Sequence, residues 1–206
     1  TRVGGNAGNS FSGTNATYNT LIGYEAGTAI TTGDYNTALG GRDTLKATTT
    51  GSYNVALGNY TLSAVTTASN NTAVGYAALN ANTASFLTAF GYQALLSNTT
   101  GTRNTALGKD ALELNTTGGS NTSVGYDSLT DNTTGAYNTA LGDAALANNT
   151  TADNNTAIGY NSLGLNTTGA NNVAVGYGAL DANTTANSNT TVGKDSLLLN
   201  TTGASN

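Results

Sequence analysis

Apolar and polar positions recur along this chain with one fixed period. The stretch 155–171, NTAIGYNSLGLNTTGAN, is one period and contains an Asn-Thr-Ala-apolar-Gly pentad, a segment centred on a leucine, and an Asn-Thr-Thr-Gly corner. The first asparagine of the pentad returns once per period without slip at Asn104, Asn121, Asn138, Asn155, Asn172, Asn189 and Asn206. Self-similarity at a fixed period is the signature of a solenoid, in which each repeat forms one coil.

Residue preferences favour strands over helices in these coils. β-branched residues, which suit strands, occupy the fourth place of many pentads: Val74, Val124, Ile158, Val175 and Val192. The leucine segment spans only about ten residues, which is marginal for a helix. The sequence therefore predicts an all-β solenoid or β-roll of about twelve coils. Because paired strands lie about 4.8 Å apart, the rod would be roughly 55 to 60 Å long.

The whole chain, 1–206, is interpreted as one repeat array with three levels of regularity. Residues 1–35 form irregular repeats, residues 36–103 contain one inserted and one deleted residue, and residues 104–206 keep the period throughout. The chain starts inside one pentad and ends on the first residue of another. We therefore expect these repeats to be part of a longer array.

The insertion and the deletion have separate interpretations. An extra glycine, Gly41, lengthens one spacing and is typical of a bulge. The deletion lies between Leu79 and Leu95, whose spacing is one position shorter than the period, and this repeat also contains Phe86 and Phe90. We expect the two aromatic side chains to fill the space that the deletion leaves.

Alternation within the pentad divides the strand into two faces. Thr156 and Ile158 share one face, while Ala157 and Gly159 share the other. We expect the Ile side, with the leucine of the next segment, to form a thin core. The small-residue side would then lie outside and pack against copies of the chain, most simply in a trimer, although it could also just face solvent. The candidate self-assembly face is Ala106, Gly108, Ala140, Gly142, Ala157, Gly159, Ala174 and Gly176.

Stacked coils place like residues above one another and so predict two ladders. The corner asparagines would form a hydrogen-bonded amide ladder: Asn98, Asn115, Asn132, Asn149, Asn166, Asn183 and Asn200. The tyrosines that directly follow the pentad glycine would form an interrupted stripe along one edge: Tyr24, Tyr76, Tyr92, Tyr126, Tyr160 and Tyr177.

Composition narrows the function classes. Only 8% of the residues are charged, against about 25% in an ordinary globular domain. The absence of Cys and His removes the most familiar catalytic and metal-binding side chains, so we expect no enzyme, cofactor or metal site. Six scattered Lys and Arg residues do not form a nucleic-acid surface. No apolar run in this stretch is long enough to insert into a membrane.

The acidic residues offer one weak route to catalysis. Asp127 and Asp143 differ by one place in the repeat and could approach each other across neighbouring coils, as a glycosidase pair requires. A polysaccharide depolymerase is therefore a less favoured possibility. Arg42-Asp43, Lys109-Asp110 and Lys194-Asp195 recur at one repeat position and are interpreted as exposed ion pairs.

The pentads resemble the Asn/Ser-x-Ala-Ile-Gly strands of the left-handed β-roll head repeats in trimeric autotransporter adhesins. The longer unit, NTALGxxAL followed by NTTG, is similar to repeat arrays of phage tail fibres. The resemblance covers nearly all of 1–206, but the repeat is longer than that of the adhesin heads, and stalk heptads and a membrane anchor are not visible. It implies a surface-exposed, non-enzymatic fibre.

Two surface properties are further hypotheses. The corner asparagines, Asn98, Asn115, Asn132, Asn149, Asn166, Asn183 and Asn200, lie in Asn-x-Thr sequons and are candidate glycosylation sites. Further sequons lie at Asn15, Asn70 and Asn189. Ice or crystal-surface binding would need threonine at alternate positions of a flat strand, whereas Thr37 is followed two places later by Leu39.

The sequence as a whole predicts a structural or adhesive fibre component of an extracellular filament, a cell-surface adhesin or a phage tail fibre. Its expected location is extracellular, at a cell or virion surface. The expected partners are copies of itself, as a lateral trimer or an end-to-end filament, and glycans or a host surface. An ice- or surface-binding solenoid is the alternative.

Overall fold

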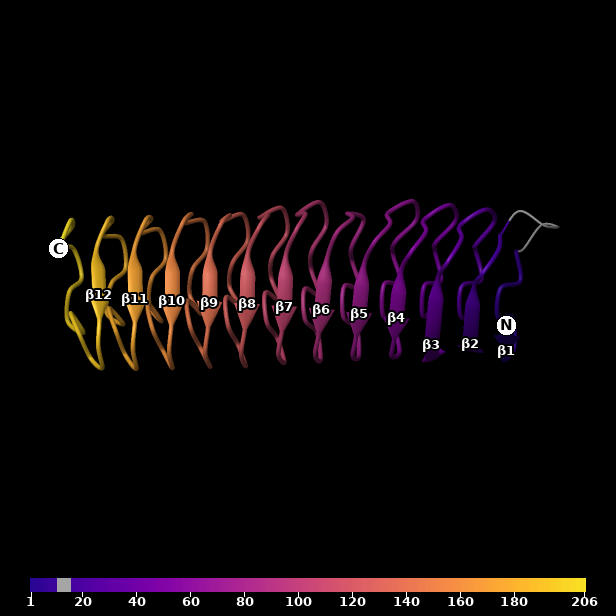
Figure 1. The fold of residues 1–206 in the computed structure, drawn as a ribbon, viewed down its shortest axis with the longest axis horizontal. Helices are drawn as coiled ribbons and strands as arrows, with labels where there is room; N and C mark the ends of the chain where they lie inside the picture. Colours follow the sequence, from indigo (N-terminus) through magenta and orange to yellow (C-terminus); the bar gives the residue numbers. More distant parts are fainter. Residues whose placement is uncertain (11–15) are drawn as a thin grey trace.

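The computed structural model, which describes residues 1–10 and 16–206, is a straight rod built on one parallel β-sheet (Figure 1). Its strands follow one another in sequence order from one end of the rod to the other. The all-β solenoid prediction is therefore confirmed. The strands are β1 (Arg2–Val3), β2 (Thr20–Tyr24), β3 (Thr37–Arg42), β4 (Val55–Leu57), β5 (Thr72–Val74), β6 (Thr88–Phe90), β7 (Thr105–Leu107), β8 (Thr122–Val124), β9 (Thr139–Leu141), β10 (Thr156–Ile158), β11 (Val173–Val175) and β12 (Thr190–Val192).

Equivalent residues of successive coils pair with each other. Between β10 and β11, for example, Ala157 pairs with Ala174 and Ile158 with Val175. The inserted Gly41 is absorbed in the longer strand β3, and the register shifts at that place between Ile22 and Tyr24 of β2. The expected bulge is therefore present.

Each regular coil contains one three-residue strand, and turns make up the rest. Backbone hydrogen bonds nevertheless join neighbouring coils around the circumference: Leu163 donates to the carbonyl of Ala179 at 3.0 Å, and Thr167 donates to that of Thr184 at 2.9 Å. The coils are thus held together on the turn side as well as in the sheet, because turn amides also find partners one coil away.

The inner side of the strand is the alanine side, so the predicted assignment of the two faces was wrong. Ala157 and Leu163 are fully buried, whereas Thr156 and Ile158 are partly exposed on the outside. The core consists of this alanine, the leucine of the turn segment and a small residue beside it, such as Ser162.

The second coil explains why alanine rather than isoleucine lies inside. Here the inward strand residue is Leu21, and Gly27 replaces the leucine of the turn segment. A Cβ atom on Gly27 would lie 2.8 Å from both Cδ atoms of Leu21, which is far inside van der Waals contact. The two positions therefore share one space that accepts a single large side chain, and close packing makes the other residue small.

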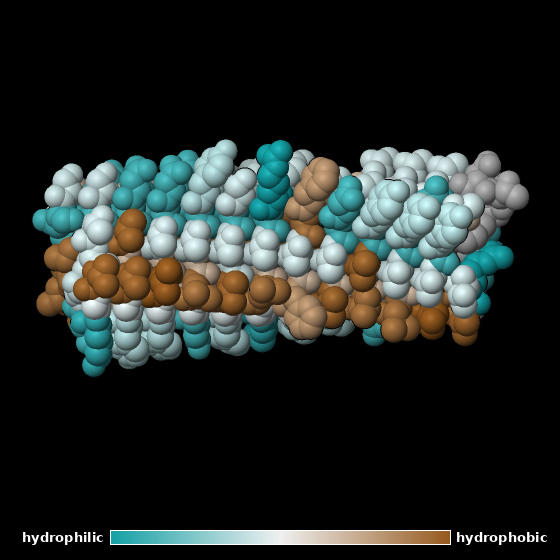
Figure 2. All heavy atoms as spheres, viewed as in Figure 1, coloured by the Kyte–Doolittle hydropathy of each residue, from teal (hydrophilic) through white to brown (hydrophobic). Residues whose placement is uncertain are grey.

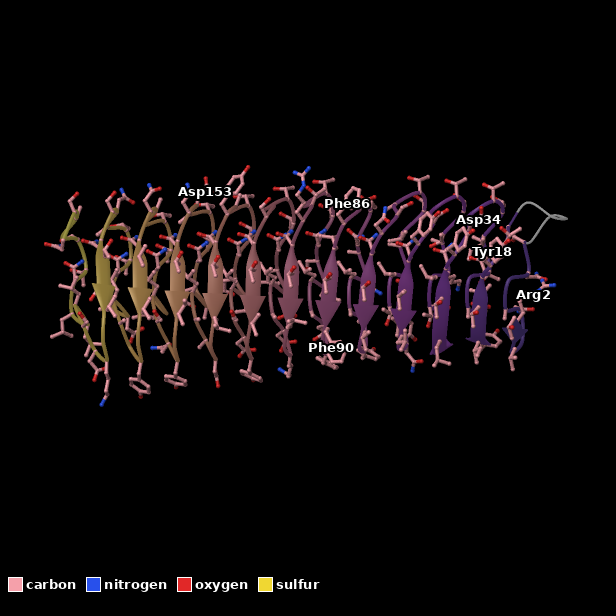
Figure 3. The ribbon with its side chains drawn as sticks, in the orientation of Figure 1. Arg2, Tyr18, Asp34, Phe86, Phe90 and Asp153 are labelled. Atoms are coloured by element: carbon pink, nitrogen blue, oxygen red, sulfur yellow. The ribbon has the colours of Figure 1, made fainter. Side chains whose placement is uncertain are left out.

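The two phenylalanines do not fill the space of the deletion near the middle of the rod. Phe86 and Phe90 are 61% and 57% exposed and lie toward opposite ends of β6 (Figure 3). Leu87 is buried at the place where other coils have the pentad asparagine. The prediction for the two phenylalanines was therefore wrong, because their positions in the repeat face outward.

Three residues other than glycine adopt the left-handed backbone conformation in a regular coil. In the coil that begins at Asn155 they are Asn161, Leu163 and Asn171, with φ of 53°, 52° and 60°. This conformation costs a residue with a Cβ atom about 1–2 kcal/mol. Leu163 adopts it within the core, where burial of its side chain offsets the cost.

Candidate interaction surface

The outer face of the sheet carries a continuous row of large apolar side chains. Each strand contributes one from the fourth place of its pentad, and the row forms the brown stripe in Figure 2. Leu141 is 45% exposed and Phe90 is 57% exposed. We call the row the apolar ladder: Val3, Ile22, Leu39, Leu57, Val74, Phe90, Leu107, Val124, Leu141, Ile158, Val175 and Val192.

A row of threonines runs beside the apolar ladder on the same face. It comes from the second place of each pentad and is interrupted by Val55 and Val173. Six consecutive strands, β5 to β10, carry Thr72, Thr88, Thr105, Thr122, Thr139 and Thr156. None of the outward positions of β4 to β12 is charged. The face therefore presents hydroxyl and alkyl groups in two parallel rows.

The small-residue face that we expected to be external is internal. Ala106, Ala140, Ala157 and Ala174 have no exposed surface. The four glycines, Gly108, Gly142, Gly159 and Gly176, have φ between 128° and 144°, and a Cβ on any of them would lie 2.1–2.5 Å from the carbonyl oxygen of the glycine one coil further on. The backbone that lies close to each glycine is thus the next coil of the same chain and not another copy. The predicted self-assembly face was therefore wrong.

The corner asparagines from Asn98 to Asn183 form the predicted amide ladder, whereas Asn200 bonds to Gly203 of its own corner. Asn149 Nδ2 donates to Asn132 Oδ1 at 2.9 Å and to its own corner carbonyl of Ala152 at 3.1 Å. Asn166 Nδ2 in turn donates to Asn149 Oδ1 at 3.0 Å. The same bond joins each successive pair from Asn82 to Asn183.

This ladder contradicts the choice of glycosylation sites. The side chains of Asn98, Asn115, Asn132, Asn149, Asn166 and Asn183 are fully buried, so a sugar on any of them would break the ladder. Asn200, in the last coil, is partly exposed. Of the further sequons, Asn189 is buried and Asn15 lies outside the described residues, whereas Asn70 is exposed and remains a predicted site.

A second asparagine ladder, which we did not predict, lies at the start of the strands. The backbone N–H of Asn155 donates to Asn138 Oδ1 at 2.9 Å, and Asn155 Nδ2 donates to the carbonyl of Gly169 at 2.9 Å. The side chain therefore bridges two neighbouring coils. The fixed recurrence of this asparagine was the signal that could have revealed it.

The tyrosine stripe lies along one edge of the apolar ladder, as predicted. Its rings are about half exposed, and those of Tyr76 and Tyr92 stack with centroids 5.4 Å apart. Tyr160 and Tyr177 stack at 5.1 Å. Between and beyond the tyrosines from Tyr92 onward, the row carries charged residues: Lys109, Asp143 and Lys194.

Lys109 fills the gap between two tyrosines of this stripe. Its Nζ lies 4.7 Å from the ring centroid of Tyr126 and 5.9 Å from that of Tyr92, as in a cation–π interaction. Its hydrogen bond with the Asp110 carboxylate raises the pKa of Lys109. Asp143 occupies the equivalent place between Tyr126 and Tyr160. The edge thus alternates aromatic rings with single charges of both signs.

A second tyrosine stack lies at the opposite edge, near the N-terminal end, and was not predicted. Tyr18, Tyr35 and Tyr53 directly precede their pentads, and their ring centroids are 4.7 and 5.0 Å apart. The pKa of Tyr35 is raised mainly by burial, and the neighbouring phenols and the Asp34 carboxylate add smaller contributions in the same direction. Figure 3 shows Tyr18 and Asp34 beside each other at this edge.

The carboxylates that could have formed a catalytic pair lie on the surface. Burial raises the pKa of Asp127, and the nearby Asp143 carboxylate adds a smaller contribution in the same direction. Burial likewise raises the pKa of Glu113 and of Asp181. Within 1–10 and 16–206, no pocket and no cluster of potential metal ligands is found.

The recurring Lys–Asp and Arg–Asp neighbours form surface ion pairs, as predicted. Arg42 and Asp43 approach to 3.9 Å and Lys194 and Asp195 to 3.5 Å. The part of the chain that the structure describes contains no helix that could cross a membrane.

Comparison with protein-family models, curated proteins and solved structures finds no match for this chain. The chemistry of its surface must therefore be interpreted from its own residues.

Proposed function

We propose that this chain is a stiff, non-enzymatic segment of an extracellular fibre, such as a surface adhesin or a phage tail fibre, and that it associates side by side with copies of itself. The apolar ladder carries this proposal. Contiguous exposed apolar patches beyond a few hundred Å² are unusual on monomeric proteins and mark interaction sites. At about 4.8 Å per coil the ladder runs for more than about 50 Å along the rod.

The construction of the rod supports a structural role. Every coil is bonded to the next by backbone hydrogen bonds in the sheet and in the turn segments. The corner asparagine ladder adds side-chain bonds between the coils from Asn82 to Asn183, and the ladder at the strand starts adds others, such as that between Asn155 and Asn138. Such an object resists bending and can hold a contact site away from a surface. Glycans or a host surface would be contacted at positions outside the apolar ladder, and the similarity to adhesin and tail-fibre repeats agrees with this division.

Self-association can be tested by light scattering after gel filtration over a range of concentrations. We expect assemblies of two or three copies that dissociate on dilution, and negative-stain images with rods lying side by side. Leu141→Lys should weaken association at least about 100-fold, because desolvating an unpaired ammonium costs several kcal/mol. Its circular dichroism should be unchanged.

Thr151→Lys provides the matched control, since Thr151 is exposed at a corner and lies outside the strands that carry the apolar ladder. This variant adds the same charge and should associate like the parent chain. A parent chain that stays monomeric at every concentration, or a Leu141→Lys variant that assembles normally, would contradict the proposal.

Binding to a flat crystalline surface such as ice is a second candidate, favoured by the threonine row. Six neighbouring strands present one threonine each in register. The ladder beside it, however, changes from Phe90 to Leu107 to Val124, so the face is uneven. Thermal hysteresis above that of a control protein would support this function, and its absence would remove it.

A further inference from the structure

We propose that the sheet face binds a second copy of the chain in the antiparallel direction, with a two-fold axis crossing the rods at β8. This inference rests on the proposed function and specifies the partner and its orientation. The axis lies in the plane between the two sheets and perpendicular to both rods. It therefore places each row of one copy on the same row of the other, with the order of the coils reversed.

The apolar ladder fits this arrangement along nine coils. Val124 meets its own symmetry mate at the axis, Leu107 lies opposite the partner's Leu141, and Val74 lies opposite the partner's Val175. The overlap from β4 to β12 is about 43 Å long and about 13 Å wide from the threonine row to the tyrosine stripe. This corresponds to about 560 Å² per copy, or about 1,100 Å² in total, which is at the lower limit for a specific interface and suits a pair that dissociates on dilution.

Charges along the two edges select the antiparallel orientation. The face itself is uncharged from β4 to β12, so the edge residues decide how two copies align. Lys109 follows β7 and Asp143 follows β9. A two-fold axis at β8 therefore places Lys109 of each copy opposite Asp143 of the other copy, which gives two equivalent ion pairs. At the opposite edge, Arg103 precedes β7 and Tyr137 precedes β9, which pairs a guanidinium with an exposed ring.

A parallel pair would lack these contacts. A two-fold axis along the rods keeps each coil at the same height and exchanges the two edges of the face. Lys109 would then lie opposite the partner's Arg103, because both flank β7. Two cations would meet at that height, and Asp143 would lie opposite the partner's Tyr137 without a cation. Charge complementarity therefore favours the antiparallel pair.

Site-specific cross-linking tests the orientation directly, since the chain contains no cysteine. Facing sheets lie about 10 Å apart, which is too far for a disulfide between them, so a short bismaleimide is the suitable reagent. Val124→Cys should give a cross-linked dimer with itself. Val74→Cys alone should give at most the background seen with Thr151→Cys, whereas Val74→Cys mixed with Val175→Cys should cross-link.

Each other outcome has a distinct meaning. If Val74→Cys cross-links with itself as efficiently as Val124→Cys cross-links with itself, the copies are parallel. The antiparallel orientation is then wrong, but the proposed function stands. If every variant gives only background and the parent chain is monomeric by light scattering, both fail.

Charge exchange provides a second test. Asp143→Lys and Lys109→Asp should each weaken dimerisation roughly tenfold at low salt, because each changes two symmetry-related pairs. The double variant should recover the affinity of the parent chain. Failure of the double variant to recover, with its circular dichroism unchanged, would overturn the proposed register, since a role of either residue in folding alone would not be restored by the exchange.

Discussion

At the residue scale, the fold depends on asparagines that serve as buried connectors rather than as polar surface. A solenoid with one alanine and one leucine per coil buries little apolar area, so the amide ladders supply much of the specific contact between coils. Buried polar groups of this kind stabilise a structure only while every partner is present.

Asn149→Ala should therefore lower the free energy of unfolding by about 1–3 kcal/mol. It leaves Asn132 Oδ1 without its donor and removes the acceptor that Asn166 Nδ2 uses between coils. Urea unfolding followed by circular dichroism measures the change. Thr151→Ala, at an exposed corner position, should unfold like the parent chain; equal midpoints for the two variants would show that the ladder adds nothing.

At the scale of the element, each regular strand is only three residues long and is followed by a glycine whose replacement strains the backbone. The glycine φ near 130° and the carbonyl of the following coil both exclude a Cβ atom. Strand length is thus limited by the chain's own stacking and not by the intrinsic preference of its residues.

Gly142→Ala should cost about 1–3 kcal/mol in backbone strain and also disturb the pairing of β9 with β10. Its Cβ would lie 2.5 Å from the carbonyl oxygen of Gly159. Gly178→Ala is the matched control: its φ is 60°, the nearest atom is a movable Asp195 oxygen, and Ala77 and Ala144 occupy the same repeat position. Comparable losses in thermal unfolding of the two variants would contradict this account.

At the scale of the whole molecule, the rod is a one-dimensional stack in which a coil contacts its two neighbours. Stability in such proteins is close to a sum over coils and the contacts between them. The Leu21 and Gly27 exchange shows that volume is balanced within a single coil, so a coil is also the natural unit of insertion or loss.

Deleting residues 155–171, one complete repeat, should give a folded rod shorter by about 4.8 Å. Asn172 then takes the place of Asn155, and every ladder continues. Deleting only 155–162 should disrupt the stack, because the inner and outer residues of all later coils lose alignment. Small-angle scattering and circular dichroism distinguish the two; a well-folded shorter deletion would argue against strict stacking.

The sequence by itself determined the period, the stacking of like residues, the corner amide ladder and the tyrosine stripe. All of these follow from repetition, since a fixed period places Asn149 over Asn132 whatever the shape of the coil. The tertiary structure decided which strand face is inside. Alternation separates Ala157 from Ile158 but does not reveal that the space under the strand is already filled by Leu163. Because that space accepts one large side chain, the larger strand residues lie outside and form the surface on which the proposed assembly depends.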